Sequence, residues 1–271
     1  MKKIILAIEA NHFPEAVLDF INELHKQQPI LLAGAFLPQA QLAEFYSYPY
    51  GVAGPYLPVL EDTNPNSLAQ DIQQFEEFCK SNNIRYCVHE DFYDSVTGSM
   101  KKESIYADLA VLSSSQFYND SENSNTYLNR VLHGSACPVV VFPENAGFPN
   151  KLIFAFDGSE DSVYAIKQFV YLFPFLAGLP IEIVYVRDGA QQEVPDEALM
   201  KEWAEQHFTN VKMSRLEINP KKYFGTWISE KKNALLVCGS FARSGFSNML
   251  SRSFVNEVIA RREIPVFIAH R

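Results

Sequence analysis

The chain alternates short apolar runs with stretches in which apolar residues recur at helical spacing. At the C-terminal end, the apolar run Ala234–Cys238 precedes a loop, a helical pattern through Arg262 and a second apolar run, Pro265–Ala269. Continuous apolar runs of this length are typical of strands buried on both faces of a parallel sheet. Two such strands joined by a helix form a βαβ unit, and open α/β sheets bind ligands at the loops that follow their strands.

The same pattern occurs twice along the chain. Lys3–Glu9 and Lys151–Asp157 both read as a lysine, five apolar residues and an acid, and they start 148 residues apart. Each half is expected to hold five strands that alternate with helices. The fold class is therefore α/β, with two tandem doubly wound five-stranded parallel sheets. The expected strands are 3–9, 30–37, 84–88, 108–112 and 138–142, then 151–157, 181–186, 211–218, 234–238 and 265–269.

The repeat predicts two domains, at 1–143 and 150–271. A short linker bounded by prolines joins them, so we expect the domains to pack on each other as an intramolecular pseudo-dimer. The first domain contains an unusual segment, 41–66, rich in aromatic residues and proline. A loop of that length is usually functional or mobile. It is interpreted as a lid, as a dimer contact that would extend oligomerisation, or as an insertion packed on its own domain.

Composition and charge exclude several classes of protein. The chain has 271 residues, 47% hydrophobic and 20% charged, which indicates a globular fold. Its most apolar window, 163–186, is broken by Pro174, Gly178 and Pro180, so no membrane span or membrane partner is expected. Residues 1–146 carry 18 acids against 8 Lys or Arg, whereas residues 147–271 carry 14 against 15. The acidic first half excludes nucleic acid as an expected partner.

The cysteines and histidines predict neither disulfides nor a metal site. Four cysteines lie far apart without a C-x-x-C pair, which favours a cytoplasmic protein with reduced thiols. Cys87 with His89, and His133 with Cys137, have the spacing of metal ligands but no two further ligands nearby. The sequence also lacks a Walker A motif, a G-x-G-x-x-G fingerprint and a G-x-S-x-G elbow. We therefore expect no enzyme, with weak ATP hydrolysis left open.

The loop after Cys238 resembles the signature of the universal stress protein family. That signature is glycine, two residues, glycine, nine residues, glycine, and then serine or threonine. The resemblance covers both halves and implies an adenine nucleotide alpha hydrolase-like, Rossmann-like fold. In this chain the four signature positions are occupied by Gly239, Ala242, Arg252 and Ser253, and the residues common between them are matched by Arg243, Gly245 and Leu250.

In nucleotide-binding members of the family, this loop wraps the phosphates of ATP. The resemblance implies that the second half binds ATP or another adenine nucleotide, with magnesium, and that Gly239→Val would abolish binding without unfolding the protein. The implied site consists of Ala155, Phe156, Asp157, Val186, Cys238, Gly239, Ala242, Arg243, Gly245, Arg252, Ser253 and Phe254.

Several of these positions have two interpretations. Asp157 either lies beside the adenosine, as the resemblance implies, or only caps the Gly158–Ser159 turn. Arg252 fills the phosphate pocket, pairs with a phosphate, or is solvated on the first turn of a helix. Cys238 is either a buried strand-end thiol or an oxidisable group. Phe254 stands where the family usually has valine and could crowd the α-phosphate.

The first half departs further from the signature. Its corresponding loop, 113–126, contains no glycine and adds Asp120 and Glu122, while Glu9 replaces the aspartate and Thr126 keeps the hydroxyl position. We interpret this half as having lost its site. Two functions follow: a universal stress protein that serves as a nucleotide-binding stress-response or regulatory module, or an interaction protein with vestigial sites that acts through self-association or partner binding.

Overall fold

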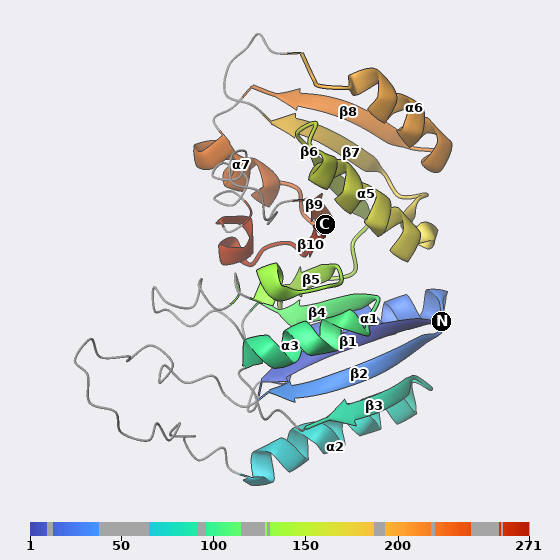
Figure 1. Cartoon of the computed structure of the whole chain (residues 1–271), viewed down its shortest axis with the longest axis vertical. Helices are drawn as coiled ribbons and strands as arrows, with labels where there is room; N and C mark the ends of the chain where they lie inside the picture. The colour runs from blue at the N-terminus through green and yellow to red at the C-terminus, as the bar shows by residue number, and fades with distance from the viewer. Residues whose placement is uncertain are drawn as a thin grey trace, which may run out of the picture.

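The structure is a computed structural model that describes residues 1–9, 13–37, 65–90, 96–114, 128, 131–186, 193–217, 220–239, 255 and 257–270. Within them, ten strands form one sheet in the order β3-β2-β1-β4-β5-β10-β9-β6-β7-β8 (Figure 1). The strands are β1 (Lys2–Glu9), β2 (Ile30–Leu37), β3 (Arg85–His89), β4 (Leu109–Ser113), β5 (Val139–Phe142), β6 (Lys151–Phe156), β7 (Ile181–Val186), β8 (Val211–Leu216), β9 (Ala234–Cys238) and β10 (Val266–Ile268).

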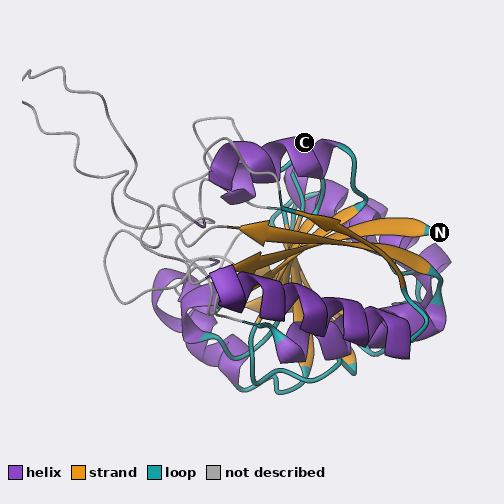
Figure 2. Cartoon of the chain, turned by 90° about the horizontal axis from the view of Figure 1, so that it is seen from below, coloured by secondary structure: helices purple, strands orange, loops and turns teal. Residues whose placement is uncertain are grey.

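Helices cover both faces of this sheet (Figure 2). They are α1 (Glu15–Gln27), α2 (Pro65–Ser81), α3 (Val96–Ile105), α5 (Glu160–Leu172), α6 (Glu197–His207) and α7 (Pro220–Ser229), with a 3-10 turn at Pro174–Leu176. Two further helical stretches are described at 128 and 131–134, and at 255 and 257–261; the second is called the C-terminal helix below. None of the helices in the described parts of the chain is long and apolar enough to cross a membrane.

Each half has the strand order 3-2-1-4-5 with all strands parallel, so the predicted fold class is confirmed. The halves meet through β5 and β10, which pair antiparallel with Val140 opposite Phe267. This pairing joins the two five-stranded sheets into one. Each fifth strand would otherwise present an open edge, and here the two edges cover each other. The exact domain limits stay a prediction.

Two layers of apolar side chains continue across the β5–β10 seam. Strand alternation sends Ile4 and Leu6 to the face covered by α1 and α5, and Ile5 and Ala7 to the opposite face. The core on the α1 and α5 side contains residues of both halves, among them Phe142 of β5 and Phe267 of β10. The halves therefore share their hydrophobic core.

Polar contacts also join the halves at the C-terminal end of α5. The Lys2 ammonium donates to the carbonyl oxygens of Tyr171, at 2.9 Å, and Leu172. The Gln28 side chain donates to the same Leu172 oxygen at 3.2 Å. These donors satisfy carbonyl groups that a helix leaves unpaired at its end, and the lysine charge suits the negative end of the helix dipole.

Several predicted boundaries shift by a few residues. β2 and β7 match their predicted ranges, whereas β3 and β10 each begin one residue later than predicted. α7 begins at Pro220. A proline is tolerated at a helix start, because the N–H that it lacks has no partner there. Pro14 lies at the N-cap of α1. Most of the aromatic segment, 41–64, lies outside the described residues.

Candidate functional site

The second half changes the side of its helical connections between β6 and β9. The helices after β6 and β7 pack with Phe154 on one face, whereas α7 and the C-terminal helix pack with Ile153 on the other. Since β6 and β9 are neighbours in the sheet, these two adjacent strands are followed by helices on opposite faces. Open α/β sheets bind ligands at such a switch point. The first half has the same arrangement between β1 and β4.

Asp157 follows β6 and organises a tight turn. Its Oδ1 accepts a hydrogen bond from the Ser159 backbone N–H at 2.9 Å, and Gly158 has a φ of +79°. A β-carbon on Gly158 would lie 2.6 Å from the Pro195 Cβ, so the segment before α6 folds over this turn. The hydrogen bond from Ser159 supports the interpretation that Asp157 caps this turn. Its side chain is exposed, so the carboxylate can also meet a ligand. Sequence reasoning did not identify Pro195.

Ala155 and Phe156 point to opposite faces of the sheet. Phe156 is only 2% exposed and packs in the core beneath α5. Ala155 is half-buried and packs toward the face of α7. A base resting on the α7 side would therefore contact the Ala155 methyl group and only the backbone of Phe156. Val186 ends β7, where its backbone pairs with Leu216 of β8.

Gly239 packs directly against the first turn of α5. A β-carbon added there would lie 2.1 Å from the Asp161 carbonyl oxygen and 2.5 Å from the Ser162 nitrogen. The backbone of Gly239 is outside the left-handed region, since Gly158 is the glycine with positive φ among the described residues. Glycine is thus required here for close approach. The expectation that Gly239→Val spares the fold is wrong, because the side chain would meet helix backbone.

Of the other predicted site residues around this loop, Cys238 lies in the described part of the chain. Cys238 is buried, and its thiol donates to the Phe267 carbonyl oxygen at 3.6 Å, which agrees with the strand-end interpretation. The remaining six predicted positions lie outside the described residues: Ala242, Arg243, Gly245, Arg252, Ser253 and Phe254.

The N-terminus of α5 lies next to Gly239 but is already capped. The Ser162 backbone N–H donates to the Ser159 hydroxyl at 3.1 Å, and the Ser162 hydroxyl donates back to the Ser159 carbonyl at 2.8 Å. Ser159 is therefore the N-cap of α5. Glu160 and Asp161 add two carboxylates to the first turn. A phosphate would meet like charges here, so the α5 N-terminus is a poor anion site.

The thiols and histidines form no chemical centre in the described part of the chain. Burial raises the pKa of Cys79 to about 12 and that of Cys137 to about 11, so both thiols stay protonated at neutral pH. Burial also raises the pKa of the Cys87 thiol. All four cysteines are free, and no group of three His, Cys, Asp or Glu side chains converges among the residues described.

Solved structures with this fold cover the whole chain. A universal stress protein from Archaeoglobus fulgidus DSM 4304 superposes with a TM-score of 0.72 at 15% identity, over 100% of this chain and 96% of its own. A protein from Pseudomonas aeruginosa UCBPP-PA14, provisionally named a universal stress protein, gives 0.62 at 11% identity over 100% and 93%. No known family profile and no curated protein sequence match the chain. The chain thus has the fold of universal stress proteins along its entire length, as the resemblance predicted.

Proposed function

We propose that this chain is a tandem universal stress protein that binds an adenine nucleotide, with magnesium, in its second half and serves as a regulatory module in a stress response. The observation that carries the proposal is the switch point between β6 and β9, which lies in a fold shared along its full length with universal stress proteins. The loop that leaves β9 at this point is the one whose sequence resembles the family signature.

The charge distribution supports a nucleotide site in the second half over one in the first. The first 146 residues hold 18 acids and 8 Lys or Arg, and a nucleotide triphosphate would be repelled there. The remaining residues are close to neutral. Because the N-terminus of α5 is capped and acidic, the phosphates would be bound instead by residues of the loop after β9, among them Arg243 and Ser253, as the family resemblance implies. Arg252 would then pair with a phosphate oxygen, and Ala155 and the end of β7 would lie against the base.

We infer a binding role and not a catalytic one, because no nucleophile, base and orienting group are brought together by the sequence motifs. The protein would act in a reducing compartment such as the cytoplasm, which suits four free cysteines.

The packing of Gly239 favours a second candidate function. If the retained glycine is explained by its contact with α5, it is not evidence for a phosphate. The chain would then be an interaction protein with vestigial sites, acting through partner binding or self-association.

Calorimetric titration with ATP and magnesium separates the two candidates, and the repeat supplies a matched pair of variants. The nucleotide proposal predicts micromolar binding by the full chain, about −8 kcal/mol. Ser253→Ala should weaken it about ten- to a hundredfold, since a hydrogen bond to a charged group contributes about 1.5–3 kcal/mol. Thr126→Ala, the same position of the first half, should leave it unchanged. Absence of both heat and co-purified nucleotide would reject the proposal in favour of the interaction protein.

A further inference from the structure

β8 forms one end of the ten-stranded sheet (Figure 1). It pairs in parallel with β7 from Val211 to Leu216. In the part of the chain that the structure describes, no strand lies on its other side. The outer edge of β8 is therefore open to a further strand. An open edge is a template for pairing with another chain, because its backbone polar groups lack partners in the sheet.

Every second residue of β8 turns its backbone polar groups toward this edge. The Ile181 N–H donates to the Asn210 carbonyl oxygen at 2.8 Å, so residues in step with Asn210 face β7. Along a strand of a parallel sheet, the N–H and C=O groups of successive residues point to alternate sides. Val211, Met213 and Arg215 therefore present their N–H and C=O groups at the outer edge.

Exposed cations flank these backbone groups on both faces of the sheet. The side chains of Lys212 and Arg215 are 65% and 51% exposed. They lie on opposite faces, because they are three positions apart in a strand. On the Lys212 face, the Glu182 carboxylate is shared between Lys212 at 3.2 Å and Lys231 at 3.3 Å. One carboxylate thus balances two ammonium groups there.

The opposite face repeats this arrangement. Glu197 of α6 pairs with Arg215 at 3.1 Å and with Lys201 at 2.6 Å. β8 itself contains no acid. Among β8 and its ion-pair partners, each face of the edge therefore has two cations for one carboxylate, so the edge carries positive charge in excess.

We propose that the outer edge of β8 binds an extended acidic segment of a partner protein, which adds to the sheet as one more strand. Main-chain hydrogen bonds to the outward residues supply affinity in this mode of recognition, and alternate side chains supply specificity. Two acids three positions apart in the segment would lie on opposite faces, one beside Lys212 and the other beside Arg215. This interaction goes beyond the proposed nucleotide binding and does not depend on it.

The same charges disfavour other occupants of the edge. Charged side chains on an edge strand commonly prevent pairing with other chains. A second copy of β8 would bring the cations of both copies together, and like charges on neighbouring strands are unfavourable. The strand at the other end of the sheet, β3, belongs to the half with 18 acids against 8 Lys or Arg, which repels an acidic segment. An acidic partner therefore fits β8 better than β3.

Fluorescence anisotropy of the full chain with labelled peptides tests the proposal. The probe is an end-blocked Val-Glu-Val-Thr-Glu-Val peptide with a Gly-Ser pair at each end, and its control has lysine in place of both glutamates. We expect saturable binding of the glutamate peptide, at least tenfold tighter than that of the lysine peptide. The glutamate peptide with N-methyl groups on its backbone amides keeps its charge but cannot donate to β8. It should bind at least tenfold more weakly than the unmodified peptide.

Protein variants locate the binding on β8. Lys212→Gln combined with Arg215→Gln should weaken binding of the glutamate peptide at least tenfold with little change in melting temperature, since both side chains are exposed. Arg85→Gln, at an exposed cation of β3, is the matched control and should leave the affinity unchanged.

Three outcomes would overturn the proposal. The first is a glutamate peptide that does not bind, or binds no better than the lysine or the N-methylated peptide. The second is equal affinity in the double variant and the wild type. The third is a wild-type dimer in sedimentation that the double variant does not form, because a second copy would then be the occupant of the edge.

Discussion

The first half has Gly34 in β2 where the second half has Ile183 in β7. The positions correspond, because Gly34 is opposite Leu6 of β1, and Ile183 is opposite Phe154, the residue 148 positions after Leu6. A β-carbon on Gly34 would lie 2.9 Å from the ring of Phe75 in α2. The first half thus combines a small strand residue with a large helix residue. The same fold therefore accepts either glycine or isoleucine at this position of the strand.

The two halves also differ at the carboxyl ends of β9 and β4. Gly239 follows β9, and Ser113, which ends β4, is its counterpart in the repeat. α5 begins at Glu160, whereas α1 begins at Glu15, which corresponds to Val163 at the repeat spacing. The second half therefore has an extra helical turn where Gly239 packs. The second half needs a glycine at this position because α5 starts earlier than α1 does.

Among these variants, Gly239→Ala should reduce the free energy of unfolding most. The new methyl group would overlap the Asp161 and Ser162 backbone, which cannot rotate away as a side chain can. We expect a loss of about 3 kcal/mol or more in the free energy of unfolding, measured by urea denaturation. Gly178→Ala is the control, because nothing lies within 4 Å of a β-carbon there. Equal midpoints for the two variants would show that Gly239 does not pack as described.

Gly34→Ala should have an intermediate effect, because the atoms it meets belong to side chains. Its methyl group would press on Phe75, which makes edge contacts with Phe36 and Tyr86 at centroid distances of 5.7 and 5.9 Å. We expect a loss of about 1–2 kcal/mol in unfolding free energy. Phe75→Leu in the same chain should recover part of it, and the double-mutant coupling should reach about 1 kcal/mol. Additive effects of the two substitutions would mean that Gly34 and Phe75 are not in direct contact.

The fold could be predicted largely because its strands are buried on both faces. Runs such as Ala234–Cys238 carry no alternation and so identify parallel strands directly. The β5–β10 pairing did not follow from these runs, because an apolar edge strand looks the same whatever covers it. The role of Gly239 was also hidden. Glycine serves both for unusual φ values and for close approach, and only the position of α5 distinguishes the two.

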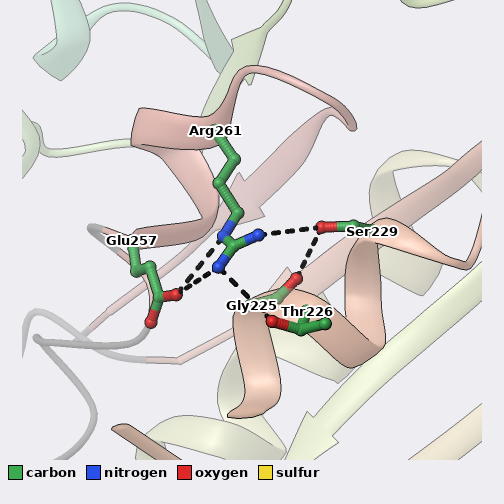
Figure 3. Close-up of polar contacts among 5 residues, drawn as sticks. All are labelled: Gly225, Thr226, Ser229, Glu257 and Arg261. Atoms are coloured by element: carbon green, nitrogen blue, oxygen red, sulfur yellow. Dashed lines mark hydrogen bonds and ion pairs between the residues drawn. The ribbon is translucent and has the colours of Figure 1, made fainter. Parts of the chain in front are cut away.

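Only part of the candidate site could be predicted from the sequence, because contacts between distant elements leave little trace in it. Asp157 and Ser159 were recognised because turn and cap residues act on their own neighbours in sequence. The ion pair of Arg261 with Glu257, which packs on Gly225 of α7 (Figure 3), was not predicted, because Gly225 and Arg261 belong to different helices and meet only in the folded chain. Its sequence signal was a glycine inside an otherwise helical segment, which is often a sign of close packing.

The Glu182 carboxylate on β7 provides a further test of the difference between the halves, with the smallest expected effect on stability. Glu182 is opposite Ile153 in the register, and the first half has buried Ala33 at the matching position opposite Ile5. The Glu182 carboxylate accepts hydrogen bonds from the Ser214 hydroxyl at 2.7 Å and from the Lys231 ammonium at 3.3 Å. Lys212 lies 3.2 Å away as a further ion-pair partner.

These partners make the contribution of Glu182 depend on pH. Burial raises the pKa of Glu182, but the hydrogen bonds from Ser214, Lys212 and Lys231 outweigh it, so the pKa is lowered from its ordinary value of 4.5. A carboxyl group with a lowered pKa stabilises the folded state above its unfolded-state value. That stability is lost as the pH falls below about 4.5 and through the folded-state pKa. Glu182→Gln should therefore cost about 1 kcal/mol of unfolding free energy at pH 7 and much less near pH 3.

Urea denaturation at both pH values measures this difference. Glu197→Gln is the comparison variant, because the pKa of Glu197 is also lowered, by hydrogen bonds from Lys201 and Arg215, although that carboxylate is exposed to solvent. Solvent screens such a pair, so its variant should change stability less at pH 7. A loss for Glu182→Gln that is the same at both pH values would mean that Glu182 contributes through packing, as Ala33 does in the first half. A loss that disappears in acid would mean that the second half has replaced an apolar contact with a charged one.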